Sequence, residues 1–91
     1  MIRTSLESDL AIPPCELLEE ELKERNMSQL ELAQLMGRPR QKINEIIKGK
    51  RAITPETALQ LERVLGISAR LWLGLESEYR LTLARQKAGK L

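Results

Sequence analysis

Residues 38–51 gather side chains that can bind a polyanion. They include six bases and a single acid, Glu45, which gives a net charge of +5 inside a chain whose net charge is only +2. Such a basic block is the electrostatic pattern of a nucleic-acid site, because Lys and Arg neutralise phosphates. Charge alone leaves a second interpretation open. The block could be a solvated helix face that pairs with residues 7–31, whose net charge is −6.

The composition argues against catalysis and against a metal site. The chain has no His and a single Cys, Cys15, so it lacks the usual general base, the commonest metal ligand and a thiolate pair. We therefore expect neither an enzyme nor a cofactor. A lone Cys fits a reducing cytoplasm, and no apolar run approaches the roughly 18 residues of a membrane span. The chain is expected to be cytoplasmic and to have no membrane contact.

The rest of the chain must position the basic block, and its composition and punctuation predict how. A length of 91 residues suits one small domain, and the abundance of Leu, Ala, Glu, Lys, Gln and Arg favours helix over sheet. We expect an N-terminal arm at 1–12 and an all-α domain at 13–88. The five predicted helices cover residues 14–25, 29–36, 39–48, 55–65 and 69–87.

Short local motifs set these boundaries. Ser28 and Glu31 form a capping box, in which each side chain can bond to the backbone N–H of the other residue. Thr54 followed by Pro55 is a typical helix start. Three glycines are expected to end helices, namely Gly37, Gly49 and Gly66.

The helices predicted at 29–36 and 39–48 form a helix-turn-helix. Ala33 is small enough for a close crossing of the two helices, and Gly37 can take the positive φ of a sharp turn. Four apolar residues would form the shared seam: Leu32, Met36, Ile43 and Ile46. These features beside a basic block predict nucleic-acid binding rather than a helical hairpin without function.

Residues 27–75 resemble the HigA-type antidote proteins, within the wider phage-repressor-like (XRE) family of helix-turn-helix regulators. They read MSQLELAQLMGRPRQKINEIIKGKRAITPETALQLERVLGISARLWLGL, and INEI with GKRAITPETAL is the most specific part. The resemblance implies a five-helix, lambda-repressor-like fold and a dimeric DNA-binding domain that often represses its own operon. It also implies a partner, a small mRNA-cleaving toxin that the antidote neutralises.

Two positions depart from the family pattern. The turn usually has a small apolar residue followed by Ser or Thr, whereas Arg38 and Pro39 stand here. This removes a hydroxyl cap and adds a charge. The first helix usually begins with Pro-Gly, and Cys15 replaces that Gly, a change we expect to affect only packing. The chain is also similar to a set of longer regulators that carry a zinc-peptidase-like second domain.

The third predicted helix is the expected reader of DNA bases. In a helix-turn-helix, the second helix of the motif enters the major groove with its N-terminal turns. Arg40 and Gln41 lie at that end, where Arg can bind guanine and Gln adenine with two hydrogen bonds. Asn44 and Glu45 follow one turn later. Because Glu45 is acidic, it would accept from cytosine or orient Arg40 or Gln41.

Phosphate contacts are expected around this helix. Ser28 and Gln29 lie at a helix N-terminus, whose free N–H groups and dipole favour an anion. Lys42, Lys50 and Arg51 flank the base-reading residues and suit the phosphates on either side. Arg38 could serve as a base reader or a phosphate contact, and we assign it to the phosphates.

The last predicted helix has more apolar surface than one core contact needs. One stripe contains Leu71, Trp72, Leu75 and Tyr79, and other sides carry Leu73, Leu81 and Leu83. A helix that is apolar on more than one face is usually buried on more than one face. We therefore predict a homodimer interface at Leu73, Leu81 and Leu83, with two recognition helices about 34 Å apart. A monomer with a well-covered terminal helix is the alternative.

Together these features predict a sequence-specific repressor that binds double-stranded operator DNA as a homodimer, autoregulates its operon and acts as an antitoxin. The acidic residues 7–31 are the expected surface for a basic toxin. A regulator without a toxin, or the N-terminal part of a longer two-domain regulator, is one alternative. A protein-interaction module whose basic stretch is incidental is another.

Overall fold

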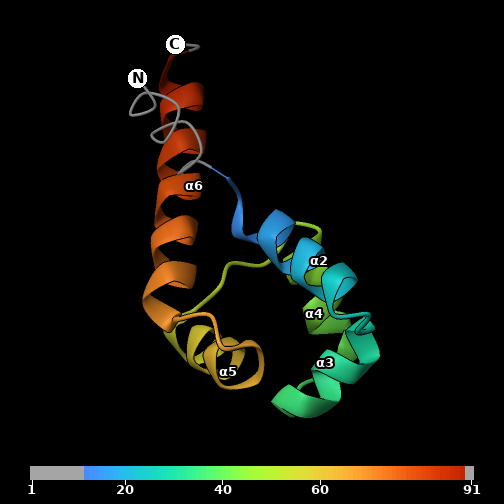
Figure 1. Cartoon of the computed structure of the whole chain (residues 1–91). Helices are drawn as coiled ribbons and strands as arrows, with labels where there is room; N and C mark the ends of the chain where they lie inside the picture. The colour runs from blue at the N-terminus through green and yellow to red at the C-terminus, as the bar shows by residue number, and fades with distance from the viewer. Residues whose placement is uncertain (1–11, 90–91) are drawn as a thin grey trace.

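The computed structural model describes residues 12–89, which form five α-helices (Figure 1). They are α2 (Pro14–Glu24), α3 (Gln29–Met36), α4 (Arg40–Ile47), α5 (Pro55–Leu65) and α6 (Ala69–Gly89). No strand occurs in the described range, and the predicted all-α, five-helix class is confirmed. The arm predicted at 1–12 lies outside the described residues except for Ile12.

Side-chain hydrogen bonds explain where two of the helices begin. Ser28 Oγ accepts from the backbone N–H of Glu31 at 3.0 Å, and Glu31 Oε1 accepts from the backbone N–H of Ser28 at 2.9 Å. This is the predicted capping box of α3. Thr54 Oγ1 accepts from the backbone N–H of Thr57 at 3.3 Å and caps α5. Both caps satisfy N–H groups that have no partner inside the helix.

The turn between α3 and α4 depends on a positive backbone φ. Gly37 ends α3 with a φ of 70°, and its N–H donates back to the carbonyl of Gln34 at 3.2 Å. A residue with a β-carbon disfavours this left-handed conformation. The predicted role of Gly37 as the turn residue of the motif is confirmed.

Four helix boundaries differ from those expected, each by one or two residues; two of them are the ends of α2 and α4, which lie at Glu24 and Ile47 instead of 25 and 48. Pro39 was placed in the first turn of the third helix, but its ψ of 143° is extended and α4 begins one residue later, at Arg40. The carbonyl of Pro39 accepts from the backbone N–H of Lys42 at 3.1 Å, so Pro39 is the N-cap. At the other end of the chain, α6 continues two residues beyond the predicted end, to Gly89.

The core lies where the helices of the motif meet α2, α5 and α6. Its largest fully buried side chains are Trp72, Leu18, Leu32, Ile43 and Leu61. All four residues of the predicted α3–α4 seam are buried, and so is Ala33 at the crossing of these helices. Burial of this apolar surface is the main stabilising contribution to such a small domain.

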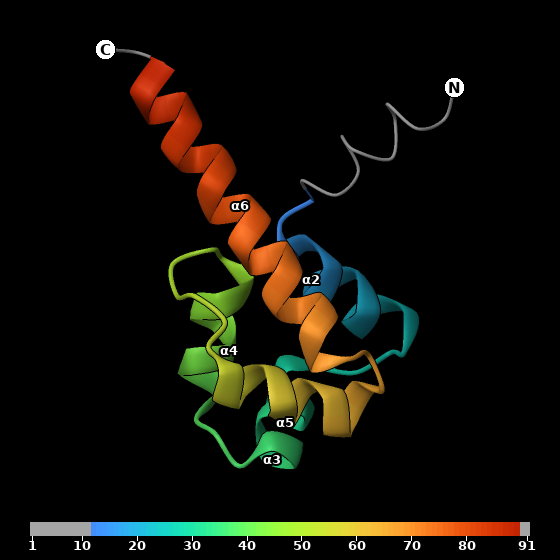
Figure 2. The same ribbon diagram turned by 90° about the vertical axis from the view of Figure 1, so that its left-hand side faces the viewer.

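Helix α6 is longer than the body of the domain needs. It packs against α5 and α2, and its C-terminal half projects beyond the other helices (Figure 2). Trp72 and Leu75 are buried, whereas Leu71 of the same predicted stripe is exposed. The fully buried Trp72 therefore fixes only the first turns of α6 in the core.

Two features are absent from the part of the chain that the structure describes. None of its helices is both long and apolar enough to cross a membrane. Across the same residues, no three His, Cys, Asp or Glu side chains gather in a way that could hold a metal ion.

Candidate nucleic-acid interface

Helix α4 presents its N-terminal turn to solvent. Arg40 and Gln41 are exposed, whereas Ile43 and Ile46 are buried against the other helices. The helical period places Ile43 and Ile46, three positions apart, on one face and Gln41 on the opposite side. Because the apolar face is anchored, the polar side chains of the first turn are held outward on a rigid element. We refer to α4 as the recognition helix.

A side-chain hydrogen bond joins the two helices of the motif. Asn44 Nδ2 donates to Gln29 Oε1 at 3.1 Å, and both side chains are half-buried. Gln29 is the first residue of α3, so the bond ties the start of α3 to the middle of the recognition helix. Asn44 and Gln29 were assigned to bases and phosphates respectively. The structure brings them together in this bond between α3 and α4.

Glu45 contacts two of the other predicted site residues. Its Oε2 accepts from Gln41 Nε2 at 3.4 Å, and its Oε1 lies 2.8 Å from both Nε and Nη2 of Arg51. The sequence left open whether this acid orients Arg40 or Gln41. The contact is with Gln41, one turn earlier on the same helix face.

The residues assigned to phosphates occupy different environments. Ser28, Lys50 and Arg51 are exposed, and Lys42 is half-buried on the recognition helix. Arg51 carries its ion pair with Glu45, whereas no carboxylate within residues 12–89 lies at ion-pair distance from Lys50. Among the described residues, the charge of Lys50 is therefore not balanced by an ion pair.

Arg38 turns toward α5. Its Nε donates to Gln60 Oε1 at 2.5 Å, and its Nη2 lies 3.6 Å from Glu56 Oε1. These two partners were not singled out in the sequence, since nothing local in α5 marks them as facing the turn. The contacts hold the turn of the motif against α5, so Arg38 contributes to the scaffold around the recognition helix.

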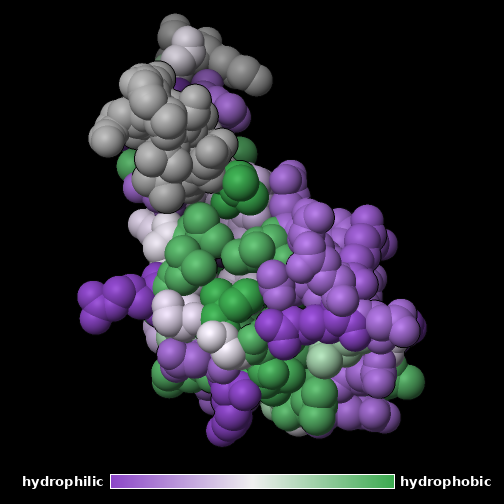
Figure 3. All heavy atoms as spheres, viewed as in Figure 1, coloured by the Kyte–Doolittle hydropathy of each residue, from purple (hydrophilic) through white to green (hydrophobic). Residues whose placement is uncertain are grey.

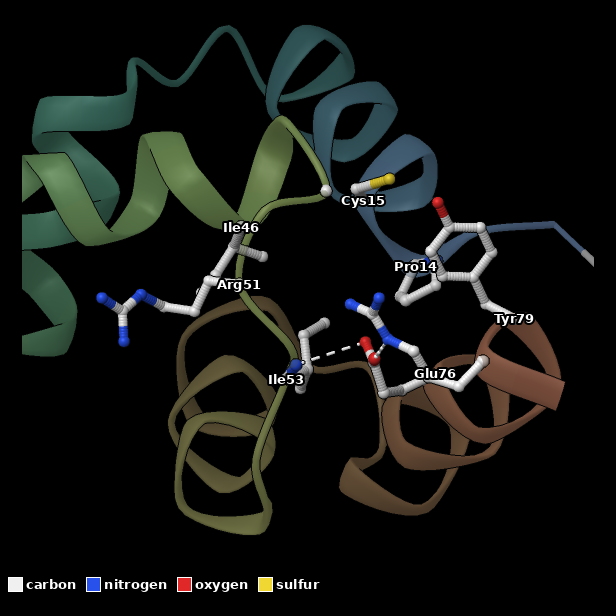
Figure 4. A pocket seen from close by; sticks show the side chains of 9 residues that line it. Pro14, Cys15, Ile46, Arg51, Ile53, Glu76 and Tyr79 are labelled. Carbon is white, nitrogen blue, oxygen red and sulfur yellow. Dashed lines mark hydrogen bonds and ion pairs between the residues drawn. The ribbon is translucent and has the colours of Figure 1, made fainter. Parts of the chain in front are cut away.

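A buried carboxylate supports the loop that follows the recognition helix (Figure 4). Glu76 of α6 is only 8% exposed, and its Oε1 accepts from the backbone N–H of Ile53 at 3.2 Å. Arg80, one turn further along α6, pairs with the other oxygen of this carboxylate. Sequence reasoning missed Glu76. The available signal was its position one turn after Trp72, on the face that enters the core.

The end of the recognition helix is packed by side chains from α2 and α6. A β-carbon built on Gly49 would lie 3.8 Å from Cys15 Sγ and 3.9 Å from Tyr79 Oη. Figure 4 shows Cys15, Pro14 and Tyr79 on the side of this loop that faces away from Arg51. Burial raises the pKa of the Cys15 thiol, so the thiol stays protonated at neutral pH. Cys15 is therefore placed as a small packing residue.

The comparisons with known proteins agree with this geometry. Residues 18–72 match the helix-turn-helix family model HTH_3. Virulence-associated protein I of Dichelobacter nodosus is 42% identical over 77 residues, which cover 84% of this chain and 71% of that protein.

Two antidote proteins of known structure resemble the chain in both fold and sequence. A HigA-family addiction module antidote protein of Coxiella burnetii is 38% identical with a TM-score of 0.81, and the match covers 87% of each chain. The antitoxin HigA of Pseudomonas aeruginosa, solved with the higBA promoter, is 35% identical with a TM-score of 0.81 and the same coverage. The chain is a DNA-binding regulator that belongs to the helix-turn-helix family and groups with its HigA-type members.

Proposed function

We propose that this protein is a repressor that binds the operator of its own operon as a homodimer, and that it is the antidote of a small mRNA-cleaving toxin. The observation that carries the DNA-binding part is the exposed pair Arg40 and Gln41 on the first turn of α4. Their side chains offer the donors and acceptors that base edges in the major groove require. The similar antitoxin HigA from P. aeruginosa, solved with promoter DNA, also supports DNA binding.

The homodimer is supported by apolar surface on α6. Leu81 and Leu83 are 42% and 39% exposed in the half of the helix that projects from the body. Leu73 is half-buried and already packs against the core of its own chain, so it would contribute less to the interface. Apolar side chains also gather between α6 and α2 on the face shown in Figure 3. A second copy would cover this surface and supply a second recognition helix.

The toxin is supported by the charge of α2. Glu16, Glu19, Glu20 and Glu24 are exposed on this helix, and hydrophilic residues cover its outer side (Figure 3). A ribonuclease that binds mRNA carries basic surface, and complementary charge accelerates its association with an acidic helix. This surface lies on a different helix from the base-reading residues. One protomer therefore has separate surfaces for DNA and for a basic protein.

Binding to the promoter of its own operon tests the repressor. The purified protein is titrated against a labelled duplex of that promoter and against a scrambled duplex of the same composition, at several salt concentrations. We expect at least a thousandfold preference for the promoter at physiological salt, as is typical of specific DNA-binding proteins. Equal affinity for both duplexes would contradict the proposal and leave a non-specific DNA-binding domain.

Co-expression with the neighbouring gene tests the antidote. Cells that express the neighbouring gene alone should arrest, and cells that express both genes should grow. Reversal of charge at Glu19 and Glu20, by Glu→Lys, should weaken the rescue and leave promoter binding intact. If both genes together arrest growth as the neighbour does alone, the regulator without a toxin remains the better description.

A further inference from the structure

Glu45 holds a fixed position between two side chains that can reach DNA. Its two carboxylate oxygens have different partners, with Gln41 at Oε2 and Arg51 at Oε1. The Arg51 contact is short, 2.8 Å from both Nε and Nη2 to the same oxygen. This short ion pair restricts the rotamers of Glu45, which is half-buried on the recognition helix. The carboxylate therefore presents a fixed acceptor to the Gln41 amide.

A carboxylate fixes which end of the Gln41 amide faces it. An ionised carboxylate can only accept hydrogen bonds, so the amide nitrogen of Gln41 must point to Glu45 and the amide oxygen must point away. At 3.4 Å this bond is long, so it biases the amide orientation and leaves the side chain free to adjust. The amide keeps its oxygen and its second N–H available at the exposed surface of α4.

The remaining donor and acceptor match one base in particular. The major-groove edge of adenine offers an N6 amino donor beside the N7 acceptor, which complements an amide oxygen beside an N–H. Guanine offers two acceptors, N7 and O6, and would need the amide to donate twice. We propose that Glu45 is a positioning residue that orients Gln41 toward adenine, an inference that rests on the proposed operator binding. Glu45 then sets base preference without touching a base.

Base preference, rather than affinity, tests this role. A pool of random duplexes is selected with the wild-type protein. Binding is then measured to four duplexes of the selected site, which differ only in the base at the position assigned to Gln41. The wild type should prefer adenine there by about 5- to 150-fold, the range of a good bidentate pair. Gln41→Ala should abolish this preference. Glu45→Ala should lower it several-fold at the same position, because the amide can then turn over.

Two further variants separate orientation from charge. Glu45→Gln keeps the size of the side chain but can donate as well as accept, so it should lower adenine preference as Glu45→Ala does. Glu62→Ala removes the same charge from an exposed site on α5 and should keep the preference of the wild type. In the Gln41→Ala background, Glu45→Ala should change no base preference further.

The alternatives give distinct results. If Glu45→Ala alters the preference for cytosine at another position in the Gln41→Ala background, Glu45 reads a base directly and the inference is wrong. A preference of Gln41 for a base other than adenine also overturns it, with operator binding intact. A wild-type protein that selects no sequence from the pool overturns both the proposed function and this inference. Thermal unfolding of each variant checks that the fold is retained.

Discussion

Glu76 and Ile53, which are 23 positions apart in the chain, are joined by a hydrogen bond of 3.2 Å from the backbone N–H of Ile53 to the carboxylate of Glu76. The bond links α6 to the loop that carries Lys50 and Arg51 (Figure 4). Arg80 balances the charge of the carboxylate from the adjacent turn of α6. The helix proposed for dimer contacts thus also holds the segment that follows the recognition helix.

Loss of the Glu76 acceptor should destabilise the domain. Glu76→Ala leaves the buried N–H of Ile53 without a partner, which should lower the free energy of unfolding by about 1–3 kcal/mol. Glu76→Gln keeps an amide oxygen for Ile53 and should cost less. Urea denaturation of both variants measures the difference. Equal losses for the two would show that the ion pair with Arg80, and not the bond to Ile53, carries the stability.

Substitution of a base-reading residue and of a phosphate-binding residue should affect the affinities for promoter DNA and random DNA differently. Arg40→Ala should lower affinity for the promoter by about 1–3 kcal/mol and change affinity for random DNA much less, because base contacts carry the discrimination. Lys50→Ala should weaken binding to promoter DNA and to random DNA about equally, and it should reduce the magnitude of the slope of log K against log salt by roughly 0.9. Titrations at several salt concentrations measure both effects. An equal loss on both DNAs for Arg40→Ala would make Arg40 a phosphate contact.

Arg38 should behave as part of the scaffold. Its hydrogen bond to Gln60 is half-buried, so Arg38→Ala should lower the free energy of unfolding by about 1 kcal/mol. The ion pair of Arg38 with the exposed Glu56 should add little to the free energy of unfolding. Gln60→Ala is the matched control, because it removes the same bond and keeps the charge. If Arg38→Ala lowers the salt slope as much as Lys50→Ala and leaves stability unchanged, Arg38 binds phosphate as the sequence indicated.

Charged residues at the projecting part of α6 should prevent association. Leu81→Glu combined with Leu83→Glu places acids on surface that we propose to be buried between two protomers, so sedimentation should detect monomers at micromolar concentration. Promoter affinity should fall because one recognition helix is lost from the complex. Leu59→Glu is the control, since Leu59 is exposed on α5. A wild-type protein that sediments as a monomer would contradict the homodimer.

Cys15 should react slowly in the folded protein. Burial raises the pKa of its thiol, so at pH 8 less thiolate is present than in the unfolded chain, and the thiolate is the reactive form. The rate of alkylation by iodoacetamide should therefore rise when urea unfolds the protein. As pH rises, the unfolded chain ionises first, so this thiol favours unfolding at alkaline pH. Equal alkylation rates with and without urea would place the thiol in solvent.

Local patterns in the sequence predicted most of the helix boundaries. Caps at Ser28 and Thr54, and the turn at Gly37, depend on residues within a few positions of each other, and each was found as expected. Pro39 was misplaced by one position because Pro is favoured in the first turn, where its missing N–H has no partner to lose, whereas here it is the N-cap. The distinction lies in ψ, which no local residue determines here.

The candidate site was less accessible to sequence reasoning, because its contacts are long-range. Gln29 meets Asn44, and Arg38 meets Gln60, only after the helices have packed. Glu76 was not singled out in the sequence, because only the packing of α6 places it beside the N–H of Ile53. Residue types and helical spacing could indicate which side chains face outward on α4. They could not indicate which of those side chains already have partners within the chain.

The exposed end of α6 has a consequence for the exchange of backbone hydrogens with solvent. Residues 83–89 are all exposed (Figure 2), and a helical segment without tertiary packing is marginally stable in water. The free energy of opening for their amide hydrogens should therefore be close to that of a fraying terminus. The amide hydrogens around Trp72 should exchange only when the whole fold opens. Any partner that covers this end would slow exchange amide by amide. The pattern of slowed amides would then outline the bound surface, for a second copy or for a toxin.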